Sequence, residues 1–141
     1  MLRTFVGLFV FFAMFLTSTC ESFASGSNTL EREVPKIITE TTTVANFIKQ
    51  AGGEKDANIL FKRCGIVQQH YVAKNEVRLR IALQSLRAEV LRRHAYLNFA
   101  LAKLVERQNS EKEIRALQFI NRTEYLLKSI EKRINAILGG R

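Results

Sequence analysis

The two histidines, His70 and His94, are the side chains of this chain best suited to acid–base chemistry near neutral pH. At a rise of 1.5 Å per residue they lie about 36 Å apart on one predicted helix, so they cannot share a site unless that helix breaks. Asp56 is the sole aspartate, and no pair of carboxylates is marked out by its spacing. Catalysis by paired carboxylates and a carboxylate-rich metal site are therefore both disfavoured.

Nucleophilic catalysis needs a serine, threonine or cysteine beside a base, and no such arrangement stands out in the sequence. The chain contains no HExxH, CxxC, GxGxxG or phosphate-binding P-loop motif. Few aromatic residues and no tryptophan are available outside the N-terminal segment to line a ligand pocket. We therefore expect a protein that is not an enzyme and that uses no cofactor and no metal ion.

Cysteine chemistry is limited to Cys64, because Cys20 lies in a predicted signal peptide. A single cysteine provides no internal disulfide framework, so helix packing alone must hold the exported domain together. Cys64 lies at helical spacing from Leu60 and Val67, which favours a small buried apolar role. The alternative is a disulfide between two copies of the chain.

Residues 1–24 have the three-part layout of a secretory signal peptide. Arg3 precedes an apolar run from Phe5 to Leu16, and the small residues that follow fit a cleavage site after Ala24. The run is shorter than the ~20 residues that span a bilayer. The alternatives are an uncleaved signal anchor and, less favoured, a lipoprotein acylated on Cys20. We expect a secreted or periplasmic protein.

The chain is strongly basic, with a formal net charge of +9. Removal of residues 1–24 leaves this charge unchanged, because Arg3 and Glu21 cancel. Such a charge predicts attraction to an acidic protein, an anionic membrane or a cell-wall polymer at low salt, although surplus basic residues also simply keep a helical protein soluble. We expect no nucleic-acid partner, because the basic segment has neither interleaved aromatic residues nor a recognised motif.

The segment Lys74–Arg107 organises the predicted fold. It lacks proline and glycine and is rich in Leu, Ala, Arg and Glu, all good helix formers. At 100° per residue its apolar residues fall on two nearly opposite faces, and a helix with two apolar faces is normally covered on both. One face comprises Leu79, Leu83, Leu86, Val90, Leu97, Leu101 and Leu104, and the other comprises Val77, Ile81, Ala88, Ala95 and Phe99.

The residues after the signal peptide predict an all-α fold. A polar stretch at 25–34 is expected to be a flexible arm, and residues 35–141 are expected to be the helical domain. Pro35 suits a first helical position, and a short helix over Lys36–Gln50 ends before two glycines.

Two further helices are predicted to form a long antiparallel hairpin. Asp56 is a suitable N-cap for a helix that continues to Gln108. A phase slip of the apolar pattern near Lys74–Val77 leaves a kink or a break as the alternative. Ser110 and Glu113 match a capping box that begins the last helix. Its apolar stripe repeats about every 3.5 residues, so we expect a three-helix bundle with coiled-coil-like packing.

Arg93 and His94 interrupt the first apolar face between Val90 and Leu97. One interpretation is a buried pH-sensitive joint at His94, whose protonation below about pH 6.5 would strain the bundle. The alternative is a residue at the helix edge whose ring tip reaches water.

The layout of export signal, short helix and long antiparallel helices resembles small periplasmic subunits of type IV secretion or conjugation machines. The resemblance is architectural and assigns no site. We expect an exported, non-enzymatic helical interaction or structural protein that binds a protein partner or a second copy. The alternatives are a secreted effector and a basic helical protein that binds membrane surfaces. The predicted partner-binding residues are Val77, Ile81, Ala88, Ala95 and Phe99, with Arg80 and Arg87 on one helix face to grip an acidic partner.

Overall fold

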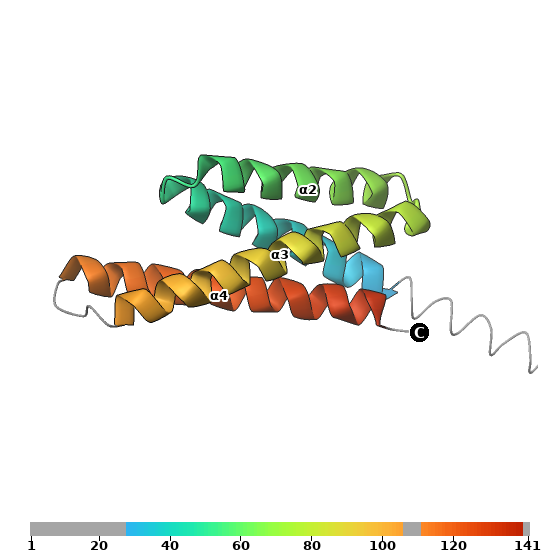
Figure 1. Cartoon of the computed structure of the whole chain (residues 1–141). Helices are drawn as coiled ribbons and strands as arrows, with labels where there is room; N and C mark the ends of the chain where they lie inside the picture. Colours follow the sequence, from blue (N-terminus) through green and yellow to red (C-terminus); the bar gives the residue numbers. More distant parts are fainter. Residues whose placement is uncertain (1–27, 106–110, 140–141) are drawn as a thin grey trace, which may run out of the picture. The chain divides into compact units, whose positions relative to one another are not determined.

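The computed structural model describes residues 28–105 and 111–139, and the regular elements in these residues are all α-helices (Figure 1). An N-terminal helix, described over residues 28–50, precedes α2 (Glu54–Val72), α3 (Glu76–Val105) and α4 (Glu111–Leu138). The predicted all-α class is thereby confirmed.

Some of the sequence-based predictions fall on residues that the structure does not describe. The signal peptide over residues 1–24, including Cys20, lies outside the described residues, as do the first residues of the predicted arm, 25–27. Ser110 of the capping box also lies outside them. Among the described helices, none combines the length and the apolar character that a membrane span requires.

The structure contains two helices, α2 and α3, where the apolar pattern favoured one long helix from Asp56 to Gln108. That prediction is wrong, and the alternative of a break at the phase slip is what the chain adopts. The two helices pack on each other and lie side by side (Figure 1), so the apolar residues on both sides of the break face one core. Asp56 is not the N-cap either, because α2 begins at Glu54 and Asp56 lies in its first turn.

The turn between α2 and α3 is built from backbone hydrogen bonds. The Asn75 N–H donates to the His70 carbonyl and the Lys74 N–H donates to the Tyr71 carbonyl, both at 3.1 Å. This pair of bonds is the Schellman motif, which requires a left-handed residue after the helix, and Lys74 adopts φ = 52°. The Asn75 Oδ1 atom then accepts a hydrogen bond from the Arg78 N–H at 3.1 Å and caps α3.

Replacing Lys74 with glycine should stabilise the protein by about 0.5–1 kcal/mol, because glycine adopts the left-handed conformation without the steric cost of a side chain. Ala73 is the matched control, since it is right-handed (φ = −72°) and its change to glycine should destabilise. Urea unfolding of the two variants measures the difference. Equal changes in the free energy of unfolding for Lys74→Gly and Ala73→Gly would contradict the assigned turn.

The N-terminal helix begins earlier than the sequence predicted. Residues 28–34 are helical, which corrects the flexible arm expected there, and Pro35 lies within the helix rather than at its first position. Packing explains the difference, because Val34 is fully buried and Glu33 is 8% exposed. The helix also accommodates the β-branched residues Thr42 and Thr43, since their hydroxyls donate to carbonyls four residues earlier.

The core lies between the helices and uses the predicted apolar faces. The first face of α3 is confirmed as buried from Leu79 to Val90, whereas Leu97 is half-buried and the side chains of Leu101 and Leu104 lie outside the described ones. The stripe of α4 is buried except at Leu117, which is half-buried. Their buried members are Leu79, Leu83, Leu86 and Val90 on α3, and Ile120, Leu127, Ile130, Ile134 and Ile137 on α4. The N-terminal helix adds Ile37, Val44 and Ala45, and α2 adds Ala57, Leu60 and Val67.

Two polar contacts join α3 to α4. Near the start of α3, Arg80 donates a hydrogen bond to the carbonyl of Ile137, near the end of α4, at 2.9 Å. Further along α3, His94 lies 3.3 Å from Glu124 in the middle of α4.

Candidate interaction surface on helix α3

Several apolar residues of α3 that the core does not use lie on its solvent-facing side. Val77, Ile81 and Phe99 expose 72%, 58% and 60% of their surface. Ala88 and Ala95 are exposed as well, so all five apolar residues predicted to bind a partner are accessible in the structure. Contiguous exposed apolar residues of this kind mark interaction sites in many proteins.

These residues belong to a longer seam with a regular spacing. Steps of four and three residues alternate along it, as in the heptad pattern of a helix that packs on another helix. We call it the outer seam, and its members are Val77, Ile81, Gln84, Ala88, Leu91, Ala95 and Asn98, with Phe99 beside the last position. Leu91, which is 40% exposed, was missed in the sequence analysis, although the four-three spacing would have found it.

Basic residues flank the outer seam on both sides. At 100° per residue, Arg78 and Arg92 of α3 lie along one side, and Arg80 and Arg87 lie along the other. The side chains of Arg78 and Arg87 make no ion pair among the described residues, and the Arg87 Nε atom is buried without a hydrogen-bond partner.

Arg80 differs from the other flanking residues because its side chain is held within the bundle. It pairs with Glu76 at 3.0 Å and donates to the carbonyl of Ile137 at 2.9 Å. Of the two arginines predicted to grip an acidic partner, Arg80 therefore links α3 to α4, and Arg87 has the freer charge.

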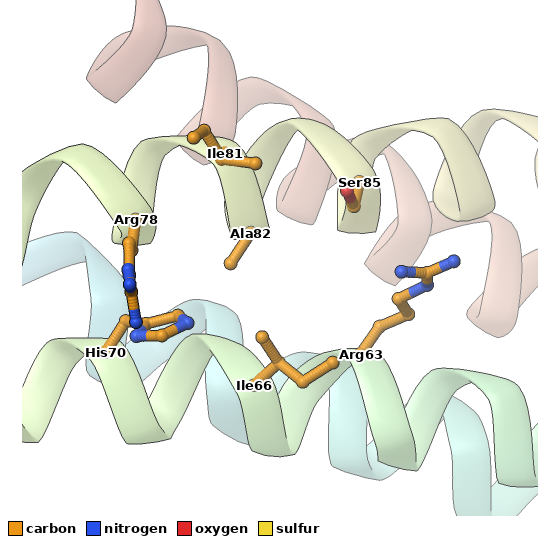
Figure 2. A pocket seen from close by; sticks show the side chains of 7 residues that line it. All are labelled: Arg63, Ile66, His70, Arg78, Ile81, Ala82 and Ser85. Carbon is orange, nitrogen blue, oxygen red and sulfur yellow. The ribbon is translucent and has the colours of Figure 1, made fainter.

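A recess of about 240 Å³ opens between α2 and α3 beside the outer seam (Figure 2). Ile66, Ala82 and Ile81 form its apolar part, and Ile81 also belongs to the outer seam. Figure 2 shows Arg78 next to His70 at one end and Arg63 towards the other. No carboxylate is among the described residues that line the recess, so its polar character is basic.

The first apolar face of α3, which is packed in the core, is called its inner face. Arg93 and His94 interrupt it and connect α3 to α2 and to α4. Arg93 pairs with Asp56 of α2 at 2.8 Å and lies 3.5 Å from Glu89. His94 is half-buried, with its Nε2 atom 3.3 Å from Glu124 of α4. A protonated His94 ring would thus face the Glu124 carboxylate, which would attract it. The contact therefore gives no reason to expect strain in the bundle. Whether His94 makes the protein pH-sensitive stays a prediction.

Hydrogen bonds from Lys128 and from His94 hold the pKa of Glu124 below its ordinary value. A carboxyl with a lowered folded-state pKa stabilises the protein above its unfolded pKa of about 4.3, and this contribution is lost as the pH falls through the folded value. We expect Glu124→Gln to reduce the loss of stability below about pH 4.5, by less than about 1 kcal/mol because the pair is partly solvated. Thermal unfolding at neutral and acid pH measures it.

Glu131 provides the control for this prediction. It lies on the same helix and makes no ion pair among the described residues, so Glu131→Gln should leave the pH dependence unchanged. A Glu124→Gln variant whose stability falls with acid as steeply as the parent's would contradict the assigned role.

Cys64 lies in the core, with only 5% of its surface exposed. Its Sγ atom is 3.6 Å from the Ile38 carbonyl and 3.9 Å from the Thr42 hydroxyl of the N-terminal helix. Burial raises the pKa of the Cys64 thiol, which keeps it in the unreactive protonated form. These features fit the small buried role better than a disulfide between two copies.

His70 and His94 do not share a site, even though the helix breaks between them. His70 lines the recess together with Arg78, and His94 lies sixteen positions further along α3, about 24 Å by the helical rise. No group of three or more His, Cys, Asp or Glu residues in the described part of the chain is placed to hold a metal ion.

Comparisons with protein-family models, with curated proteins and with solved structures find no match to this chain.

Proposed function

We propose that this chain is an exported, non-enzymatic helical interaction protein whose outer seam is buried against a partner in an assembly. The observation that carries the proposal is the exposure of the apolar residues of that seam on a helix whose opposite face is packed in the core. A folded helix gains free energy by burying such residues, at roughly 25 cal/mol per Å² of apolar surface.

The proposal includes export through residues 1–24, whose composition fits a secretory signal peptide. It also includes a long antiparallel hairpin of α3 and α4, which the order of their contacts supports. Such a protein would suit a small subunit of a secretion or surface assembly, and a secreted effector is the alternative.

An apolar dye that fluoresces on exposed hydrophobic surface, combined with light scattering, tests the proposed surface. We expect the exported protein either to bind the dye as a monomer or to self-associate. Ile81→Asp, at a large exposed apolar residue of the seam, should reduce either signal several-fold without unfolding the chain. A monomer that binds no dye would overturn the proposal.

Attachment to an anionic membrane surface is the second candidate, because the outer seam is flanked by basic residues. Helices that lie in a membrane interface bury a broad apolar face, whereas this seam is narrow and contains the polar residues Gln84 and Asn98. Co-sedimentation with anionic and neutral vesicles separates the two candidates, since only membrane binding requires the anionic lipid.

A further inference from the structure

We propose that the outer seam of α3 binds an acidic amphipathic helix of a partner protein, whose carboxylates face the basic residues on both sides of the seam. This inference rests on the proposed function, because it identifies the class of partner that the same surface would bind.

The spacing of the seam specifies a helix as its occupant. Alternating steps of four and three residues keep the seam straight along one side of α3, where a second helix can insert its side chains between them. From Val77 to Phe99 the seam is about 33 Å long by the helical rise, which corresponds to about three heptads. The small residues Ala88 and Ala95 leave room in the seam for larger side chains of a partner.

The charges beside the seam specify an acidic occupant. In a helix pair these flanking positions meet the flanking positions of the partner helix, where opposite charges attract and like charges repel. Here both sides are basic, with Arg78 and Arg92 on one and Arg80 and Arg87 on the other.

The acidic residues of this part of α3 offset Arg80 and Arg92, but they leave Arg78 and Arg87, one on each side of the seam, without an ion pair among the described residues. Glu76 is held by Arg80, and Glu89 is buried against Arg92 and Arg93. Two copies of α3 placed seam to seam would therefore bring basic residues against basic residues, which disfavours a second copy as the occupant.

The recess between α2 and α3 provides a place for a carboxylate at the edge of this interface. Ile81 joins it to the seam, so a partner helix seated on Ile81 lies at its mouth (Figure 2). Arg63 and Arg78 line the recess without an ion pair among the described residues, and His70 lies beside Arg78. A glutamate of the partner would find an unpaired guanidinium group at either end of the recess.

Synthetic peptides of about four heptads test the inference, with leucine and isoleucine in the seam positions and either glutamate or lysine in the flanking positions. Binding to the full chain, purified from an exporting host, is measured by calorimetry at low and high salt. We expect the glutamate peptide to bind with one-to-one stoichiometry, about tenfold more tightly than the lysine peptide, and the preference to shrink at high salt.

A charge-reversed pair of variants makes the test independent of folding. Arg78→Glu with Arg92→Glu, two exposed residues on the same side of the seam, should reverse the preference toward the lysine peptide, a gain that a misfolded protein cannot produce. Lys49→Glu with Lys132→Glu is the matched control, because both residues are exposed on other helices and the change in net charge is the same. It should retain the preference for the glutamate peptide.

The alternative outcomes separate this inference from the proposed function. Equal binding of both peptides, or self-association that excludes them, would overturn the acidic helix and leave the interaction surface standing. Binding to anionic phosphatidylglycerol vesicles without binding of either peptide would show that the basic residues beside the seam bind a membrane. This result would also overturn the acidic helix as the occupant. A monomer that binds no peptide, vesicle or apolar dye would overturn both proposals.

Discussion

Replacing Leu86 with alanine should lower the free energy of unfolding by about 3 kcal/mol. Leu86 lies on the inner face of α3 with none of its surface exposed, between the buried residues Leu83 and Val90. Its truncation removes apolar surface from the core and leaves a cavity that rigid neighbouring helices fill only in part. Urea unfolding followed by circular dichroism measures the loss.

Ile81→Ala is the matched control for Leu86→Ala, because it truncates a branched aliphatic residue on the same helix but on the outer seam. Ile81 is 58% exposed, so its truncation should change the free energy of unfolding by no more than about 0.5 kcal/mol. Losses of similar size for the two variants would contradict the division of α3 into a buried inner face and an accessible outer seam.

That division could be predicted from the sequence because it depends only on periodicity. The apolar residues of α3 separate into two sets at 100° per residue, and the first set is buried as expected at Leu79, Leu83 and Leu86. Periodicity does not say how many helices surround α3. It therefore could not decide which of the two sets forms the core without assuming the rest of the fold.

The break between α2 and α3 was only the alternative to one long helix, because its signal conflicts with propensity. Lysine is a good helix former and is uncommon in the left-handed conformation, yet Lys74 adopts φ = 52° where glycine would be expected. Asn75 was the better signal, since asparagine is a favoured N-cap and here caps α3. Together with the phase slip, Asn75 would have favoured a turn.

Long-range polar contacts were beyond the reach of the sequence. Arg93 appeared to be a defect in the inner face of α3, but it pairs with Asp56 across the turn that had been read as helix. The recess beside the outer seam was missed for the same reason, because Arg63 and Arg78 line one recess only when α2 folds back on α3.

Replacing Arg133 with methionine should lower the free energy of unfolding by about 2 kcal/mol. The guanidinium group of Arg133 on α4 pairs with Glu33 at 2.6 Å and with Glu40 at 3.1 Å, both on the N-terminal helix. The Ser129 hydroxyl donates to the same Glu40 carboxylate. Thermal and urea unfolding of the full chain would measure the loss.

The expected loss comes mainly from the carboxylates that the variant leaves behind. The side chain of Glu40 is only 19% exposed, so without Arg133 it would keep a charge that water reaches poorly. These same carboxylates raise the pKa of Arg133, in keeping with their stabilisation of its charged form. Two further variants separate this cause from a general loss of positive charge.

Lys132→Met removes the same charge from an exposed neighbour and should cost little. In a Glu33→Gln, Glu40→Gln background, Arg133→Met should lose most of its effect, because neither side chain then carries the charge with which Arg133 pairs. An undiminished loss in that background would show that the aliphatic part of Arg133, and not its charge, stabilises the contact between the N-terminal helix and α4.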